Sequence, residues 1–157
     1  MSKLKKETFE IFDKGWHIGT QTIIYNKEAL LKNNHFDNKY FRDIFLISDL
    51  LTVGKAYCLN EFMAVYRIHE GGIYSSTNEL ERAETGALVY KEIYKAYSNN
   101  KYLKSKYLKF TNSYIRLLIK HELYKKALYA ADELTTNTSE PEAYKEDLFK
   151  YIENFLL

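Results

Sequence analysis

Cysteine and proline are nearly missing from the sequence. It contains one cysteine, Cys58, and one proline, Pro141, among 157 residues. A single cysteine excludes an intrachain disulfide framework and a cysteine-rich metal site, and it fits a reducing compartment. There are also only six glycines, and a chain with so few turn-forming residues favours long helices.

Long apolar runs are missing as well. No stretch approaches the length that crosses a bilayer. Residues 1–10 carry basic side chains, but no apolar segment follows them as it would in a secretory signal peptide. We therefore expect a cytoplasmic protein.

Several catalytic signatures do not occur. The sequence has no Asp-x-Asp, no glycine-rich phosphate loop, and no GxSxG, HExxH or CxxC pattern. Each of these patterns places specific groups around a phosphate, a nucleophile or a metal. The sequence therefore offers no support for the corresponding nucleotide, serine hydrolase, zinc protease or dithiol sites.

The charges are distributed unevenly. Residues 1–100 balance, residues 101–126 carry a net charge of +7, and residues 127–157 carry −5. The basic and acidic blocks either form paired helices or present a basic face to an anionic partner such as a membrane surface. A solvated amphipathic helix is the simpler interpretation. Nucleic acid is not expected, because no known binding module accompanies the basic residues.

Periodicity predicts mixed elements up to residue 76 and helices after it. The expected helices in the first part are 8–14, 27–32 and 41–53, and the expected strands are 20–25, 55–59 and 62–68. The helix over 41–53 is apolar nearly all round, which indicates burial, and Gly54 ends it. A polar loop follows over residues 70–76.

The second part is predicted to form four helices. They are expected over 78–97, 101–122 and 124–134, and, after a linker at 135–139, from Pro141 onward. The second of them has an apolar seam of Leu103, Tyr107, Phe110, Tyr114, Leu117 and Leu118. We expect this helix to pack against the acidic helix that starts near Pro141.

One ordered set of residues runs through the first part of the chain: Asp43, Gly54-Lys55, Tyr66-Arg67, His69 and Gly71-Gly72. This order and spacing resembles the acceptor-side portion of bacterial family 2 glycosyltransferases with the GT-A fold. The likeness covers about residues 7–76. It implies an α/β, predominantly helical fold. Residues 1–76 would form the C-terminal part of a GT-A-like domain with few strands, and residues 77–157 a helical C-terminal extension that forms a bundle.

The resemblance implies roles for three residues. Asp43 would be the catalytic base that takes a proton from an acceptor hydroxyl. Arg67 and His69 would lie on the donor side, near the diphosphate, with His69 also a candidate metal ligand. The structural alternatives are a carboxylate that complements the helix dipole and a loop ion pair.

One position departs from the family pattern. Arg42 stands where the family usually has Gly, Ser or Glu, and it would alter the pocket or pair with Asp43. The remaining histidines, at positions 17, 35 and 121, are expected to be structural.

The implied activity is transfer of a sugar from a nucleotide-sugar donor to a glycan or lipid-linked acceptor, in surface polysaccharide or glycan assembly. The intact enzyme would use Mg²⁺ or Mn²⁺. The nucleotide-binding half with its Asp-x-Asp motif is missing from these residues, so the chain resembles a C-terminal fragment with Met1 as an internal start.

We expect the isolated chain to be inactive, to bind no metal by itself and to self-associate, with peripheral membrane contact in the intact enzyme. The alternative is a non-catalytic helical interaction module that keeps a degenerate transferase segment.

Overall fold

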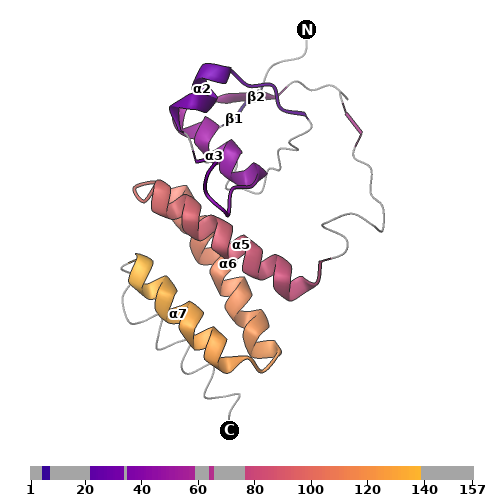
Figure 1. Ribbon diagram of the computed structural model, residues 1–157, viewed down its shortest axis with the longest axis vertical. Helices are drawn as coiled ribbons and strands as arrows, with labels where there is room; N and C mark the ends of the chain where they lie inside the picture. Colours follow the sequence, from indigo (N-terminus) through magenta and orange to yellow (C-terminus); the bar gives the residue numbers. More distant parts are fainter. Residues whose placement is uncertain (1–4, 8–21, 34, 59–63, 66–76, 139–157) are drawn as a thin grey trace. The chain divides into compact units, whose positions relative to one another are not determined.

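The computed structural model describes residues 5–7, 22–33, 35–58, 64–65 and 77–138. The chain forms two compact units, residues 1–72 (the first unit) and residues 73–157 (the second unit). The described part is predominantly helical, as the sequence predicts (Figure 1). In that part, no helix combines the length and the apolar composition that crossing a bilayer requires.

The first unit contains two short strands and two helices among its described residues. Strands β1 (Lys5–Glu7) and β2 (Ala56–Cys58) pair antiparallel, with Lys6 opposite Tyr57. Helix α2 (Lys27–Lys32) begins after Asn26, whose side chain accepts hydrogen bonds from the backbone N–H groups of Glu28 and Ala29. This cap satisfies two of the amides that the first turn of a helix leaves unpaired.

Helix α3 (Asp43–Val53) is the buried element of the first unit. Phe45 is fully buried, and Ile47 and Leu51 form a core cluster against Ile23, Ile44 and Ala56. The helix ends at Gly54, whose N–H donates to the Leu50 carbonyl. Gly54 has extended backbone, so the helix stops without a left-handed residue.

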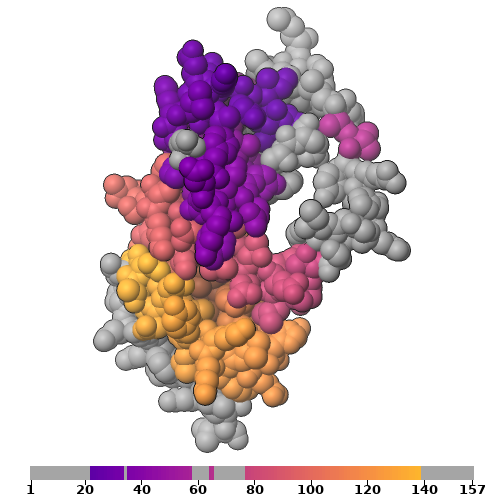
Figure 2. Space-filling view, in the orientation of Figure 1, coloured from indigo at the N-terminus to yellow at the C-terminus, as the bar shows by residue number. Residues whose placement is uncertain are grey.

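The second unit consists of three described helices, α5 (Glu79–Ala96), α6 (Lys101–Lys120) and α7 (Tyr124–Thr138). Asn78 and Asn100 cap α5 and α6 through their side-chain oxygens. Helix α6 packs against both α5 and α7. Figure 2 shows the side chains of these helices filling the space between the ribbons of Figure 1.

The turn between α6 and α7 has a left-handed residue that is not glycine. Glu122 has a φ of 59°. The N–H of Leu123 donates to the Leu118 carbonyl at 2.8 Å, and the N–H of Glu122 donates to the Ile119 carbonyl at 2.9 Å. These two bonds form a Schellman motif, which satisfies carbonyl groups at the end of α6.

The buried face of α6 differs from the predicted seam. Leu103, Tyr107 and Leu118 are buried as expected. Phe110, Tyr114 and Leu117 are only half-buried, and Thr111, Ile115 and Ile119 take their places in the core. Because α6 is covered by helices on two sides, the row spaced by four residues is buried rather than the row that the apolar composition suggested.

Helices α5 and α6 approach closely at Gly86. A Cβ atom at this position would lie 2.8 Å from Cδ1 of Phe110. The Phe110 ring in turn packs on Tyr90, with the ring centroids 4.4 Å apart. Glycine therefore makes room for this pair of aromatic rings between the helices.

Three local predictions differ from the structure. The strand predicted over 20–25 is wrong for residues 22–25, which form no strand. The linker predicted over 135–139 is wrong for residues 135–138, because α7 continues through Thr138. Strand β1 was not predicted, since its lysines and glutamate have weak strand propensity and it pairs with a distant segment.

The described residues test the other predicted elements only in part. The strand over 55–59 is confirmed as the three residues of β2. Of the strand predicted over 62–68, Ala64 and Val65 are not in a strand, and the other residues lie outside the described ones. The helices over 8–14 and from Pro141 also lie outside them. The described residues contain one two-stranded sheet, and the GT-A-like fold stays a prediction.

Candidate functional site

Asp43 is the first residue of α3, two residues after the start predicted for the helix over 41–53. Its side chain is exposed, and Oδ1 accepts a hydrogen bond from the N–H of Ile44 at 2.8 Å. A carboxylate at a helix N-terminus is stabilised in its ionised form by the helix dipole. Asp43 is therefore an exposed carboxylate at the start of a helix that is otherwise largely buried.

In the described contacts, the guanidinium group of Arg42 binds backbone carbonyls and not Asp43. Its Nη1 donates to the carbonyl of Phe41 at 2.7 Å and more weakly to that of Lys39 at 3.4 Å. None of the described ion pairs joins Arg42 to Asp43. The departure at position 42 thus leaves the carboxylate exposed.

The other predicted site residues, Arg67 and His69, lie outside the described residues, as do Tyr66 and the glycine pair at 71–72. The structure therefore does not place them beside Asp43. In the described ranges, no three His, Cys, Asp or Glu side chains lie close enough to hold a metal ion together.

A polar network inside the first unit was not predicted. Asp49 is 2% exposed, and its Oδ1 lies 3.1 Å from Nδ1 of His35. The His35 ring packs on Phe45 with 5.1 Å between the ring centroids. Asn33 donates to Thr52 Oγ1 at 2.6 Å and to the Asp49 carbonyl at 3.3 Å.

This network connects the segment before α3 to the middle of the helix. A buried carboxylate needs a partner, because desolvation makes an unpaired charge costly. The position of Asp49 in an apolar helix signals that need. The sequence does not show that His35, 14 residues earlier, meets it.

The second unit contains a groove of about 370 Å³ between α5, α6 and α7. Its walls combine small apolar side chains with aromatic and charged ones. The lining residues are Glu84, Ala87, Leu88, Lys91, Tyr107, Thr111, Tyr114, Lys125, Lys126, Tyr129, Ala130 and Glu133. Sequence reasoning placed Tyr107 and Tyr114 on the seam of α6 and predicted no groove.

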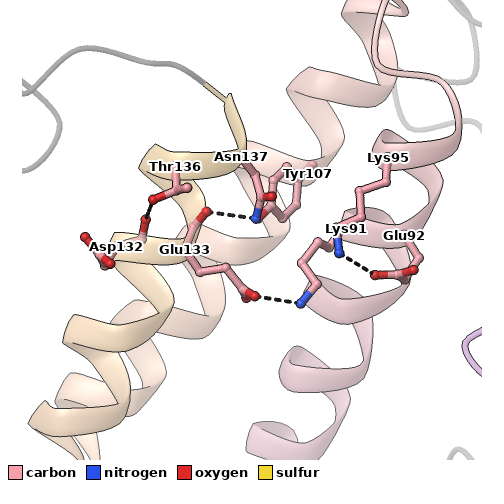
Figure 3. Close-up of polar contacts among 8 residues, drawn as sticks. All are labelled: Lys91, Glu92, Lys95, Tyr107, Asp132, Glu133, Thr136 and Asn137. Carbon is pink, nitrogen blue, oxygen red and sulfur yellow. Dashed lines mark hydrogen bonds and ion pairs between the residues drawn. The ribbon is translucent and has the colours of Figure 1, made fainter.

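Polar pairs connect the three helices around this groove. Lys91 of α5 contacts Glu133 of α7, with 2.9 Å between Nζ and Oε1 (Figure 3). Asn137 donates to the Glu133 carbonyl at 2.9 Å and, at 3.4 Å, to the hydroxyl of Tyr107. The hydroxyl of Tyr114 donates to Oε1 of Glu84 at 3.0 Å, which joins α6 to α5.

Two tyrosines of the groove have perturbed acidity. Burial raises the pKa of Tyr107 to about 12. Burial also raises the pKa of Tyr114 to about 12, with further contributions from the hydrogen bond to Glu84 and its charge. Both phenols are therefore neutral at physiological pH. In the described contacts the Tyr114 hydroxyl donates and the Tyr107 hydroxyl accepts.

Among the described residues that line the groove, Thr111 has a buried hydroxyl that forms no hydrogen bond. The residue is 5% exposed, and its hydroxyl oxygen has no hydrogen-bond partner. Burial removes a hydroxyl from water, and without a hydrogen bond to protein this desolvation costs free energy. The Thr111 hydroxyl therefore destabilises the folded protein.

Comparisons with protein-family models, with curated proteins and with solved structures found no match to this chain.

Proposed function

We propose that this chain supplies the acceptor-side half of a glycosyltransferase, with Asp43 as the catalytic base. The observation that supports this role is the position of Asp43, an exposed carboxylate at the first residue of a buried helix. The residue pattern from Asp43 to the glycine pair at 71–72 supports the same assignment.

The carboxylate of Asp43 does not need to be a strong base before the reaction starts. As the acceptor hydroxyl attacks the anomeric carbon, its oxygen becomes more acidic, so that even a weak base can accept the proton. The bond from the anomeric carbon to the diphosphate breaks, and the nucleoside diphosphate leaves. Asp43 holds the proton that the acceptor loses.

The first unit also supplies rigidity for this step. Phe45 is buried two residues after Asp43, and the His35–Asp49 pair holds the preceding segment to the same helix. A base must stay within hydrogen-bonding reach of its proton, so a fixed helix start favours catalysis.

On the donor side, Arg67 and His69 would contact the diphosphate. Mg²⁺ or Mn²⁺ in the intact enzyme prefers several oxygen ligands, which a partner half would provide, with His69 as an additional candidate ligand. The acceptor would be a glycan or a lipid-linked saccharide of surface polysaccharide or glycan assembly, handled at the cytoplasmic side with peripheral membrane contact.

The test is substitution of Asp43 in the intact enzyme, which contains the donor half as well. Asp43→Asn removes the base with almost no change in shape, so turnover should fall by about 10²–10⁴-fold while donor binding stays nearly constant. Release of the nucleoside diphosphate from a panel of nucleotide-sugars measures turnover whichever sugar is transferred.

Asp37→Asn is the matched control, because Asp37 is an exposed carboxylate of the same unit. It should leave turnover unchanged. Near-normal turnover of Asp43→Asn would show that Asp43 only complements the helix dipole. That result would favour the second candidate function, a non-catalytic helical interaction module, which the groove in the second unit supports.

A further inference from the structure

Helix α6 has a row of positive charges on its solvent-exposed face. Lys101, Lys109, Arg116 and Lys120 are all exposed, and their spacing places them on one side of the helix. We call these four residues the basic stripe. The other exposed residues of α6 are two serines that lie between them. Because α6 has 20 residues and is therefore about 30 Å long, the stripe is an extended row of cations.

No carboxylate of α6 neutralises the stripe. Residues 101–120 include six basic residues and no Asp or Glu, and none of the described ion pairs involves the stripe. On α5, by contrast, Lys91 and Lys95 each contact a glutamate. Solvated helices usually mix both signs, because opposite charges four residues apart stabilise a helix and like charges destabilise it. An anionic partner would offset the repulsion within the stripe.

The start of α6 has the same feature. Lys101 is the first residue of the helix, and no acidic residue lies in the first turn. The helix dipole disfavours a cation at this end and favours a carboxylate. The charge of Lys101 therefore does not stabilise the helix that carries it, which is a second reason to expect a partner outside α6.

The packing of α6 restricts the kind of anionic partner. The major groove of a DNA duplex admits a single α-helix, whereas α6 has both α5 and α7 packed against it. Single-stranded nucleic acids stack their bases on exposed aromatic rings, but no aromatic side chain of α6 is exposed. The stripe therefore offers ionic contacts without a means of reading or stacking bases.

We propose that the basic stripe of α6 binds the surface of a membrane that contains anionic lipids. Such a surface presents many negative headgroups in one plane, and a straight row of cations can contact this plane along its whole length. Peripheral membrane contact is part of the function proposed above, and α6 provides a surface for it. The electrostatic argument itself does not depend on whether the chain belongs to a transferase.

Sedimentation of the whole 157-residue chain with lipid vesicles tests the proposal. Vesicles of phosphatidylcholine with phosphatidylserine should bind the chain, and vesicles of phosphatidylcholine alone should not. Each charge should contribute about fivefold to the partition coefficient. The triple variant Lys109→Gln, Arg116→Gln, Lys120→Gln should therefore bind roughly a hundredfold more weakly. Added salt should release the bound chain, because it screens exposed charges.

The matched control removes three lysines from the first unit, through Lys27→Gln, Lys32→Gln and Lys39→Gln. These side chains are exposed, so the control loses the same net charge without a change in α6. It should bind anionic vesicles nearly as well as the unchanged chain does. Equal losses in the two triple variants would show that only net charge matters and would overturn the proposal.

Circular dichroism shows whether each variant keeps the helical content of the unchanged chain. If the triple variant of the stripe unfolds, Arg116→Gln alone repeats the test with an expected loss of about fivefold. An unchanged partition coefficient for a folded stripe variant would contradict the proposal.

Two other results would also overturn it. Failure of the unchanged chain to bind anionic vesicles would show that the stripe is a solvated face or is covered by another part of the chain. Tighter binding to a DNA duplex or to polyuridylate than to vesicles at the same salt concentration, lost in the stripe variant, would assign the stripe to nucleic acid.

Asp43→Asn separates this inference from the proposed function, because it should leave vesicle binding unchanged. Vesicle binding together with normal turnover of Asp43→Asn would contradict the catalytic proposal alone. Lost turnover of Asp43→Asn without vesicle binding would contradict the membrane contact of α6 alone.

Discussion

At the scale of single residues, Thr111 is a polar side chain that is buried at a cost in free energy. Its hydroxyl is enclosed by α6 and its neighbours and has no hydrogen-bond partner. Natural proteins satisfy most buried polar groups, so an exception calls for a reason. Thr111 therefore lowers the stability of the folded protein relative to an apolar side chain of the same shape.

Replacing Thr111 by valine should therefore stabilise the free protein. The substitution keeps the branched shape and removes the unsatisfied hydroxyl, so the free energy of unfolding should rise by about 1–2 kcal/mol. Urea unfolding followed by circular dichroism measures the change. Thr138→Val is the control, because the Thr138 hydroxyl donates to the Leu134 carbonyl at 2.7 Å. A gain of the same size in the control would contradict the explanation.

Tyr107 and Tyr114 should be visible in a titration. Their pKa values are raised from 10.0 to about 12 in the folded protein. The sequence has 15 tyrosines. A fraction of them should ionise about two pH units above the pKa of an ordinary tyrosine. The absorbance of tyrosinate measures this fraction, and Tyr107→Phe and Tyr114→Phe should each reduce it. In denaturant, all tyrosines should titrate together.

The same shifts determine how stability depends on pH. Each folded pKa lies above the unfolded one, so the stabilisation is fully present below pH 10. Above pH 10 the unfolded chain loses these two protons first. The stability of the second unit should therefore fall as the pH rises through about 12, and constant stability across that range would contradict the assignment.

Among the elements, the end of α6 shows a local conflict between residue type and backbone. The Schellman motif requires a left-handed residue, which glycine adopts at little cost. Glu122 occupies the position instead, with a φ of 59°. The packing of α6 against α7 compensates for the strain.

Glu122→Gly should relieve this strain. Left-handed backbone costs a non-glycine residue roughly 1–2 kcal/mol, and glycine's own entropy offsets part of the gain. The free energy of unfolding should thus rise by about 0.5–1 kcal/mol. His121→Gly is the control at the neighbouring position, where φ is −95°, and it should destabilise. Destabilisation by both substitutions would show that the Glu122 side chain itself contributes more than the strain costs.

At the scale of the whole molecule, the proposal assigns this chain one side of a transfer reaction. The first unit has an exposed base candidate, and its large apolar side chains Ile24, Leu31 and Phe36 are exposed. Single exposed apolar side chains are common on protein surfaces, so the proposed donor half rests on the residue pattern around Asp43 and not on them.

The 157-residue chain alone should therefore not bind a nucleotide-sugar. A His and an Arg do not replace the oxygen ligands that a metal-bound diphosphate needs. Calorimetry with a panel of nucleotide-sugars and Mn²⁺ measures this. Binding of a donor by this chain with micromolar affinity would refute the division into a donor half and an acceptor half.

Much of the local structure follows from the sequence by itself. The helices predicted over 27–32 and 78–97 are found at Lys27–Lys32 and Glu79–Ala96, and Gly54 ends α3 as predicted. Caps and helical periodicity act between residues about four positions apart, so they do not depend on how the rest of the chain folds. The helix predicted over 41–53 is confirmed by α3, although it begins two residues later, at Asp43.

Tertiary structure decided which of these helical faces are buried and which distant residues meet. Sequence reasoning favoured Phe110 and Tyr114 for the seam of α6, because they are more apolar than Thr111, yet two neighbouring helices bury Thr111. The pairing of Asp49 with His35 and the groove at Tyr129 also depend on contacts between separate elements. Such contacts depend on how whole surfaces pack, and no short-range pattern in the sequence encodes them.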